Sequence, residues 1–521
     1  MTSDQPRGRR FVLINPTYTR LWAGQSVSAL GDVMFSTTLV LWVATVLAKG
    51  QPWAPAAVSA VLLATGVAVL VMGPLAGVFA DRWDGRLTML RADQIRFGIA
   101  GVLAIVSFVP AHDLPVGAWL AIVCVDVLAL NAVGQFFTPA RYSVMREVVH
   151  GDADRARAAG IAQATSGTLA IVGPPLAAPL LFGAGLQWAL VFNAISYLVS
   201  FMAIRSVKVA PKPAAHPAAL PGMAAGQPMR PSVLREFAAG LRFFGGSRFL
   251  VALLTLAVIG QFGVGAINEL DVFFLTRNLH ASSQLYGYLG TAFGIGGIIG
   301  ALMAGRMVGW IGARATAWGG LLVGGVLLIG YSRQVSFAGG VALIFLMAIP
   351  ITMLNTAMAP LLMASAPREF IGRVVAVFQP VTQLASMVST VLAGWLASAP
   401  LRNLAAAPAG VRLGPIDTIF GVAGLLVIAA GVYGRRALPA LNENEAKPAA
   451  EQAAEARLAA GAELAAGAET AAGAQMAAEA GLLALADRDS ERELEVMAHS
   501  ADEPLEDSGP AGDPSAGGGS R

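Results

Sequence analysis

Carboxylates that lie inside long apolar runs are the first candidates for chemistry in this chain. Asp32 follows Arg20 by twelve residues, or about 18 Å along a helix, and Gln25 precedes it in the same run. Asp126 lies midway along a second run, and Glu269 lies near the end of a third. A charge inside hydrocarbon costs at least about 2.5–3.5 kcal/mol on insertion scales. We therefore expect these carboxylates to bind protons or a substrate.

An aromatic and several neutral polar residues complete this set of candidates. Phe35 lies about one turn beyond Asp32, and an apolar lining with a few carboxylates suits a bulky lipophilic, cationic compound. The other candidates for lining a pathway are neutral and polar: Gln25, Asn131, Asn193, Asn355, Gln379 and Gln383. Structural alternatives stay open, because Asp32 could hydrogen-bond a neighbouring helix and Glu269 could lie in an extracellular mouth wetted by water.

Two further pairs of charges have structural interpretations. Asp93 and Arg96 are three residues apart, so we expect a structural ion pair on one helix face. Glu269 and Asp271 are two apart, so their side chains point about 200° from each other and cannot both face one cavity.

The sequence contains no pattern typical of an enzyme or of a metal site. Its five histidines are scattered over loops and span ends, and its one cysteine, Cys124, lies in an apolar run. No Walker sequence (GxxxxGK[ST]) occurs, which excludes the usual site for direct use of ATP. We expect no catalytic residues, no metal and no cofactor.

The composition is that of a membrane protein. Of 521 residues, 56% are hydrophobic and 13% are charged, whereas soluble proteins carry roughly 25% charged residues. Most apolar runs reach the roughly 20 residues with which a helix crosses a bilayer. The expected spans are 20–46, 56–79, 88–109, 116–138, 160–182, 187–205, 249–275, 285–305, 315–332, 337–360, 374–397 and 416–434. The sequence thus predicts an all-α polytopic membrane protein with twelve transmembrane helices.

Basic residues sort by side of the membrane. Most Arg and Lys lie in the N-terminus and in the connections after even-numbered spans, so the positive-inside rule places both termini in the cytoplasm. This excess reports topology and does not indicate nucleic-acid binding. Residues 437–521, with 17 acidic and 5 basic residues, predict an acidic, Ala/Gly-rich disordered cytoplasmic tail. The other expected parts are a cytoplasmic N-terminus 1–19, helical bundles 20–205 and 249–436, and a cytoplasmic central linker 206–248.

The connection between the second and third spans, GVFADRWDGR, carries a recognisable motif. It resembles the Gly-x-x-x-Asp-Arg-…-Gly-Arg loop of the major facilitator superfamily, with one extra residue. The matching positions are Gly77, Asp81, Arg82, Gly85 and Arg86. The resemblance implies two pseudo-symmetric six-helix bundles around a midplane cavity, with Asp81 latching the cytoplasmic side against the eleventh span. Gly173-Pro174 in the fifth span resembles the family's antiporter motif, of which only this dipeptide remains.

The segments LWAGQSVSALGD, RADQIR and APREFIGRV are similar to those of macrolide-efflux and enterobactin-type siderophore exporters. This resemblance implies export of a hydrophobic drug-like compound or secondary metabolite by proton antiport, across the inner (plasma) membrane of a bacterium. The expected partners are a small-molecule substrate, protons and the lipid bilayer, and we expect a monomer. The alternatives are a dedicated siderophore or metabolite exporter, an uptake symporter, and a membrane sensor or scaffold that does not transport.

Overall fold

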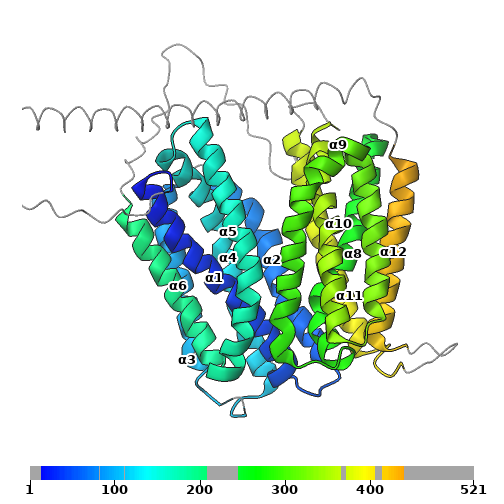
Figure 1. Ribbon diagram of the computed structural model, residues 1–521. Helices are drawn as coiled ribbons and strands as arrows, with labels where there is room; N and C mark the ends of the chain where they lie inside the picture. The colour runs from blue at the N-terminus through cyan, green and yellow to red at the C-terminus, as the bar shows by residue number, and fades with distance from the viewer. Residues whose placement is uncertain are drawn as a thin grey trace, which may run out of the picture. The chain divides into compact units, whose positions relative to one another are not determined.

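The computed structural model describes residues 13–80, 83–110, 112–207, 245–364, 371–404 and 413–438, which belong to one compact unit. The elements of these residues are helices, and no strand occurs among them (Figure 1). The all-α prediction is confirmed. The N-terminal segment 1–12 and nearly all of the expected linker and tail lie outside the described residues.

The described residues of the first half form six long helices. Asn15 caps the first one, because its side-chain oxygen accepts a hydrogen bond of 2.7 Å from the Tyr18 N–H, and Pro16 follows at the first helical position. The first and fifth helices continue into π-helical turns, η1 (Val43–Leu47) and η2 (Leu180–Ala184). The helices are α1 (Pro16–Trp42), α2 (Ala54–Ala80), α3 (Gly85–Val106), α4 (Val116–Val148), α5 (Asp152–Pro179) and α6 (Leu186–Ser206).

The described residues of the second half also form long helices, but there are five of them, because one helix contains two expected spans. Its long helices are α8 (Arg248–Arg277), α9 (Tyr286–Ser332), α10 (Phe337–Ala364), α11 (Ile371–Ser398) and α12 (Pro415–Ala437), with a short 3-10 turn, η3 (Ser283–Leu285), before α9. Two expected spans, 285–305 and 315–332, fall within α9. They are separated at Gly312, whose φ of 82° breaks the helix and is a conformation that glycine adopts without strain.

Ten helices of the described residues are long and apolar enough to cross a membrane. In that number α9 counts once, although it holds two expected spans. The third expected span corresponds to α3, which contains four charged residues and is not among the ten. The chain is a multi-pass membrane protein, and the count of twelve spans stays a prediction.

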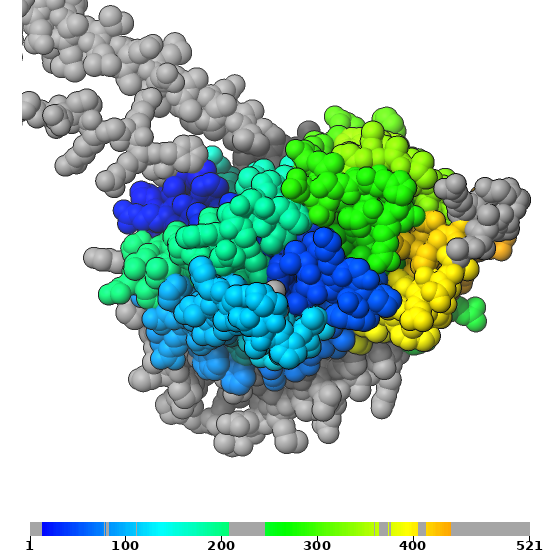
Figure 2. All heavy atoms as spheres, turned by 90° about the horizontal axis from the view of Figure 1, so that it is seen from below, coloured from blue at the N-terminus to red at the C-terminus, as the bar shows by residue number. Residues whose placement is uncertain are grey.

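The helices gather into two bundles that meet along two pairs of helices. Helices α1 to α6 contact one another, as do α8 to α12, and the main contacts between the bundles join α2 to α11 and α5 to α9 (Figure 1). At the end where α2 begins, Ala56 N donates to Ser398 Oγ at 3.0 Å and Ser59 Oγ donates to Thr390 O at 3.1 Å. Figure 2 views this end, where blue residues lie against yellow ones. We call it the joined end.

A glycine on α9 makes the second contact between the bundles possible. A Cβ atom on Gly287 would clash with Pro175 Cα and with Pro174 O, both backbone atoms that cannot move aside. Nearby, Thr291 Oγ1 donates to Ile171 O at 2.8 Å. Any side chain at position 287 therefore forces α5 and α9 apart.

We predict that Gly287→Ala opens the joined end. Overpacking typically costs about 1–3 kcal/mol, which should lower the population of the joined state about fivefold or more. The measurement is the yield of disulfide between Ala56→Cys and Ser398→Cys after mild oxidation, in a Cys124→Ser background. Gly319→Ala on the same helix is the control, because a Cβ atom there meets nothing within 4 Å. Equal disulfide yields in both variants would contradict the prediction.

Candidate functional site

A charged cluster joins three helices of the first bundle. Asp32 of α1 accepts a hydrogen bond of 2.5 Å from the Tyr197 hydroxyl of α6, and its other carboxylate oxygen lies 3.9 Å from Arg96 Nη2 of α3. The Arg96 guanidinium carbon also lies 4.8 Å from the centre of the Tyr197 ring. The Asp32 side chain keeps 41% of its surface exposed, against 13% for Arg96. The carboxylate is thus held on one side and open on the other.

This cluster differs from the predicted pairing of Asp93 with Arg96. The ion pair of Arg96 is with Asp32, because the long guanidinium side chain crosses from α3 to α1. Asp93 is fully buried beside Ser200 of α6. Spacing along one helix gave the shared face correctly but could not show which neighbouring helix supplies the partner.

The other membrane carboxylates are buried in separate places. Asp126 is 7% exposed on α4. Asp271 accepts a hydrogen bond of 2.5 Å from the Tyr331 hydroxyl inside the second bundle. Glu269 is fully buried beside Ser59, a residue of the first bundle, and therefore lies where the two bundles meet. With the joined end closed, Glu269 is shielded from water, and the alternative of a water-wetted mouth applies to a state in which that end is open.

A pocket of about 330 Å³ lies between the two bundles next to the joined end. Its lining is mostly neutral and comes from α1, α2, α8, the start of α9, and α11. The lining residues are Ser36, Thr37, Val40, Leu62, Leu63, Thr65, Gly66, Asn268, Tyr286, Gln383, Ser386, Met387 and Thr390. We call this the central pocket.

The central pocket contains one residue that was expected to line a pathway, Gln383 of α11. None of the carboxylates predicted to bind protons or substrate is part of its lining. The signal lay one to five positions away, since Ser36 and Thr37 follow Asp32 in its run and Asn268 directly precedes Glu269. Neutral polar residues beside a membrane carboxylate are therefore candidates for lining a pocket, as the carboxylate itself is.

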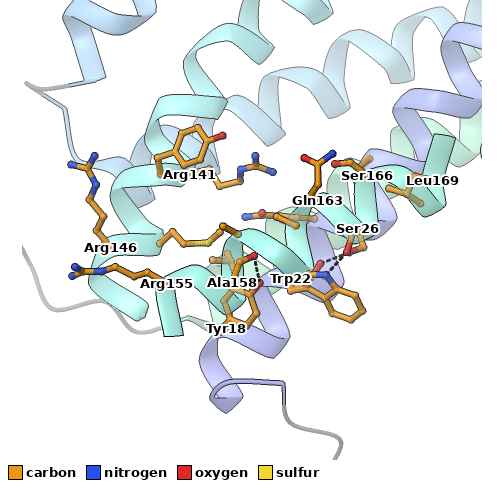
Figure 3. Close-up of a pocket in the computed structure, with 18 residues that line it drawn as sticks. Tyr18, Trp22, Ser26, Arg141, Arg146, Arg155, Ala158, Gln163, Ser166 and Leu169 are labelled. Carbon is orange, nitrogen blue, oxygen red and sulfur yellow. Dashed lines mark hydrogen bonds between the residues drawn. The ribbon is translucent and has the colours of Figure 1, made fainter. Parts of the chain in front are cut away.

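The remaining predicted pathway residues are dispersed. Phe35 is buried at 6% exposure, and Asn131 donates from its side-chain amide to Val127 O of its own helix at 2.8 Å. Asn355 and Gln379 are exposed on α10 and α11. Gln25 lines a second pocket, of about 470 Å³, between α1, α4 and α5 (Figure 3).

The predicted gating loop is described only in part, because Asp81 and Arg82 lie outside the described residues. Gly77 lies in the last turn of α2, and Gly85 begins α3. Arg86 Nη2 donates to the Arg205 carbonyl at the end of α6, at 2.9 Å. This bond ties the start of α3 to α6.

The Gly173-Pro174 dipeptide lies at two helix contacts. Gly173 packs against Val33 of α1, and Pro174 approaches Gly287 and Gly290 of α9. The dipeptide therefore takes part in the contact between the bundles. Within the described ranges no three His, Cys, Asp or Glu residues are grouped as a metal site would need.

Comparison with known proteins identifies relatives along most of the chain. The family profile described as Major Facilitator Superfamily matches residues 21–275 and 269–474. Macrolide efflux protein A of Streptococcus pyogenes is 23% identical over 380 residues, which are 72% of this chain and 88% of that protein. The MFS-type transporter YfiS of Bacillus subtilis (strain 168) is 24% identical over 392 residues, covering 72% of this chain and 86% of that one.

Solved structures share the fold at low sequence identity. A mutant of the nucleoside transporter NupG has a TM-score of 0.62 at 12% identity, covering 81% of this chain and 100% of its own. A bacterial homologue of the iron transporter ferroportin, in an inward-facing state, has a TM-score of 0.62 at 13% identity, covering 81% and 98%. These likenesses concern the fold alone.

We predict that Arg96→Gln lowers the free energy of unfolding by about 1–3 kcal/mol, because it leaves Asp32 without its cation. This is less than for a fully buried pair, since Asp32 is partly exposed. Thermal unfolding in detergent measures the effect, with Arg91→Gln, an exposed position on the same helix, as the control. The double variant Asp32→Asn/Arg96→Gln should be more stable than Arg96→Gln alone. If Arg96→Gln and Arg91→Gln unfold at the same temperature, the cluster does not stabilise the bundle.

Proposed function

We propose that this chain, which belongs to the major facilitator superfamily, exports a hydrophobic drug-like compound or a secondary metabolite in exchange for protons. Membership makes it a membrane transporter of a small molecule and places it outside the enzyme families. Export is supported by the relative from Streptococcus pyogenes, whose name states macrolide efflux.

The arrangement of the bundles supports alternating access. The central pocket has walls from both bundles and lies against the joined end. If both termini are cytoplasmic, as the basic residues indicate, the joined end faces the outside. Substrate would then enter from the cytoplasm, and separation of α2 from α11 and of α5 from α9 would release it outside.

The observation that carries proton coupling is the position of Glu269. Its carboxyl is fully buried where the bundles meet, and no ion pair to it occurs among the described residues. An ionised carboxylate is costly to bury without a cation, so closing the joined end over Glu269 requires a proton. With the joined end open, a proton from outside can reach the carboxyl, and protonation lets that end close over it. The proton would then leave to the cytoplasm through the central pocket, which Asn268 lines, as substrate enters. The ionised carboxylate destabilises the closed joined end and favours its opening with substrate bound, so one proton moves in as substrate moves out.

Asp32 has a second role in this proposal. Protonation of its carboxyl would remove the attraction to Arg96 and loosen α1 from α3. Because Asp32 is partly exposed, both a proton and a substrate cation can reach it. Asp126, buried in the same bundle, is a further candidate for holding a proton.

We predict that Glu269→Gln abolishes proton-driven export, because glutamine imitates the protonated carboxyl and cannot release a proton. The measurement is accumulation of lipophilic cations and macrolides in efflux-deficient cells, with and without a protonophore. Asp32→Asn should reduce export as well. Asp271→Asn is the matched control, since Asp271 is buried on the same helix but bonds only within its own bundle.

Two results would contradict this prediction. Export by Glu269→Gln at the rate of the unmodified protein would remove Glu269 from the coupling mechanism. The second result is that the unmodified protein is present in the membrane but lowers the accumulation of no tested compound. This would exclude broad drug efflux and favour a single native metabolite as substrate.

A further inference from the structure

The pocket between α1, α4 and α5 lies in the first bundle, away from the joined end. It is lined by the last turns of α4 and the first turns of α5, near a hydrophobic cluster that includes Tyr18, Val144 and Ala158. Its volume is about 470 Å³, larger than that of the central pocket. If both termini are cytoplasmic, as proposed above, this pocket lies on the cytoplasmic side, from which substrate would enter.

The charged side chains that line the pocket are all positive. Three arginines line it, Arg141, Arg146 and Arg155, and none of its lining residues is acidic. Arg155 has an acidic partner outside the lining, Asp152 at 3.2 Å. Arg141 and Arg146 have no ion pair in the described part of the chain, and Arg141 Nε is buried without a hydrogen bond. Two guanidinium groups are thus left without a counter-charge.

The rest of the wall is aromatic and neutral. Trp22 Nε1 donates to Thr165 Oγ1 at 2.9 Å, and Tyr18 donates to Ala158 O at 3.3 Å, so hydrogen bonds orient both rings. Figure 3 shows Arg146 and Arg155 at one end of the pocket and Ser166 and Leu169 at the other. Arg155 and Leu169 are about 21 Å apart along α5. The pocket therefore has a cationic end and an uncharged end that contains the Trp22 ring.

We propose that this pocket binds an amphiphilic acid, whose carboxylate, sulfonate or phosphate contacts Arg141 and is attracted by the charge of Arg146, while its apolar body lies against Trp22. Guanidinium groups bind such anions through paired, charge-assisted hydrogen bonds. The inference rests on the proposed export function and narrows its substrate class to compounds with an acidic group. This substrate class excludes compounds that carry only positive charge. The acid can be a free solute or the headgroup of an anionic lipid, which share this chemistry.

The test uses two dyes that differ in one carboxyl group. Rhodamine 110 has a free carboxylate, and rhodamine 123 is its methyl ester. Binding of each dye to the purified full chain in phosphatidylcholine nanodiscs is measured by fluorescence anisotropy. We expect rhodamine 110 to bind more tightly than the ester. Arg146→Gln and Arg141→Lys should each weaken its binding, by about tenfold for loss of a charged hydrogen bond, and leave binding of the ester unchanged.

Arg205→Gln is the matched control, because it removes one positive charge from an exposed position of the same bundle that does not line the pocket. Equal affinity for the two dyes, or an equal loss in Arg205→Gln, would overturn the proposal. A second set of nanodiscs contains phosphatidylglycerol. If this lipid displaces rhodamine 110 only when Arg146 is present, the acid is a lipid headgroup; if it does not, the acid is a free solute.

Binding requires no proton gradient, so the two proposals fail separately. If rhodamine 110 binds as expected but cells export none of the tested compounds, acidic or cationic, the pocket is supported and the export function is wrong. If cells export cationic compounds and the nanodiscs show no preference for the acid, only the inference about the pocket is wrong.

Discussion

The cost of placing charge among apolar helices is the constraint on which the rest of this structure depends. A carboxylate inside a helix is costly without a donor, and for three of them the fold supplies one from a neighbouring helix, whereas buried oxygens of Asp93, Asp126 and Glu269 have no hydrogen-bond partner among the described residues. Asp32 receives the Tyr197 hydroxyl and the Arg96 guanidinium, Asp271 receives the Tyr331 hydroxyl, and at one end of the second bundle the Asn278 amide donates to Asp417. These contacts stabilise the observed arrangement of the helices, because removing one partner would leave a polar or charged group unmatched in an apolar surrounding.

The contacts between the bundles follow a different rule. Among the described residues, the hydrogen bonds across the joined end involve hydroxyl groups and backbone atoms, as in Ser59 with Thr390, and small residues such as Gly287 allow close approach. Such an interface has good packing without strong ionic attraction, so it can open without separating paired charges. Glu269 is the exception, since it is a carboxyl buried at this surface. Its protonation state therefore affects whether the interface closes.

The two pockets differ in chemistry in a way that suits successive steps of transport. The central pocket has neutral polar and apolar walls from both bundles, which would let a solute leave as the bundles move. The pocket with three arginines belongs to one bundle alone, so its shape does not depend on the contact between bundles. A binding site whose shape does not change when the bundles move can bind a solute before the solute reaches the central pocket.

Hydropathy alone determined the all-α membrane fold and the approximate limits of most helices, because every backbone polar group in hydrocarbon must be bonded within its own helix. The loop motif that includes Gly85 and Arg86 indicated the family, because its residues lie close together along the chain and can be recognised without knowledge of the fold. The sequence could not show that Arg96 reaches Asp32, that Glu269 lies against Ser59, or that Arg141 and Arg155 line one pocket. Those residues are far apart along the chain, and helix packing alone decides which side chains of different helices meet. Helical spacing limits each side chain to one face, and only the tertiary structure decides what that face touches.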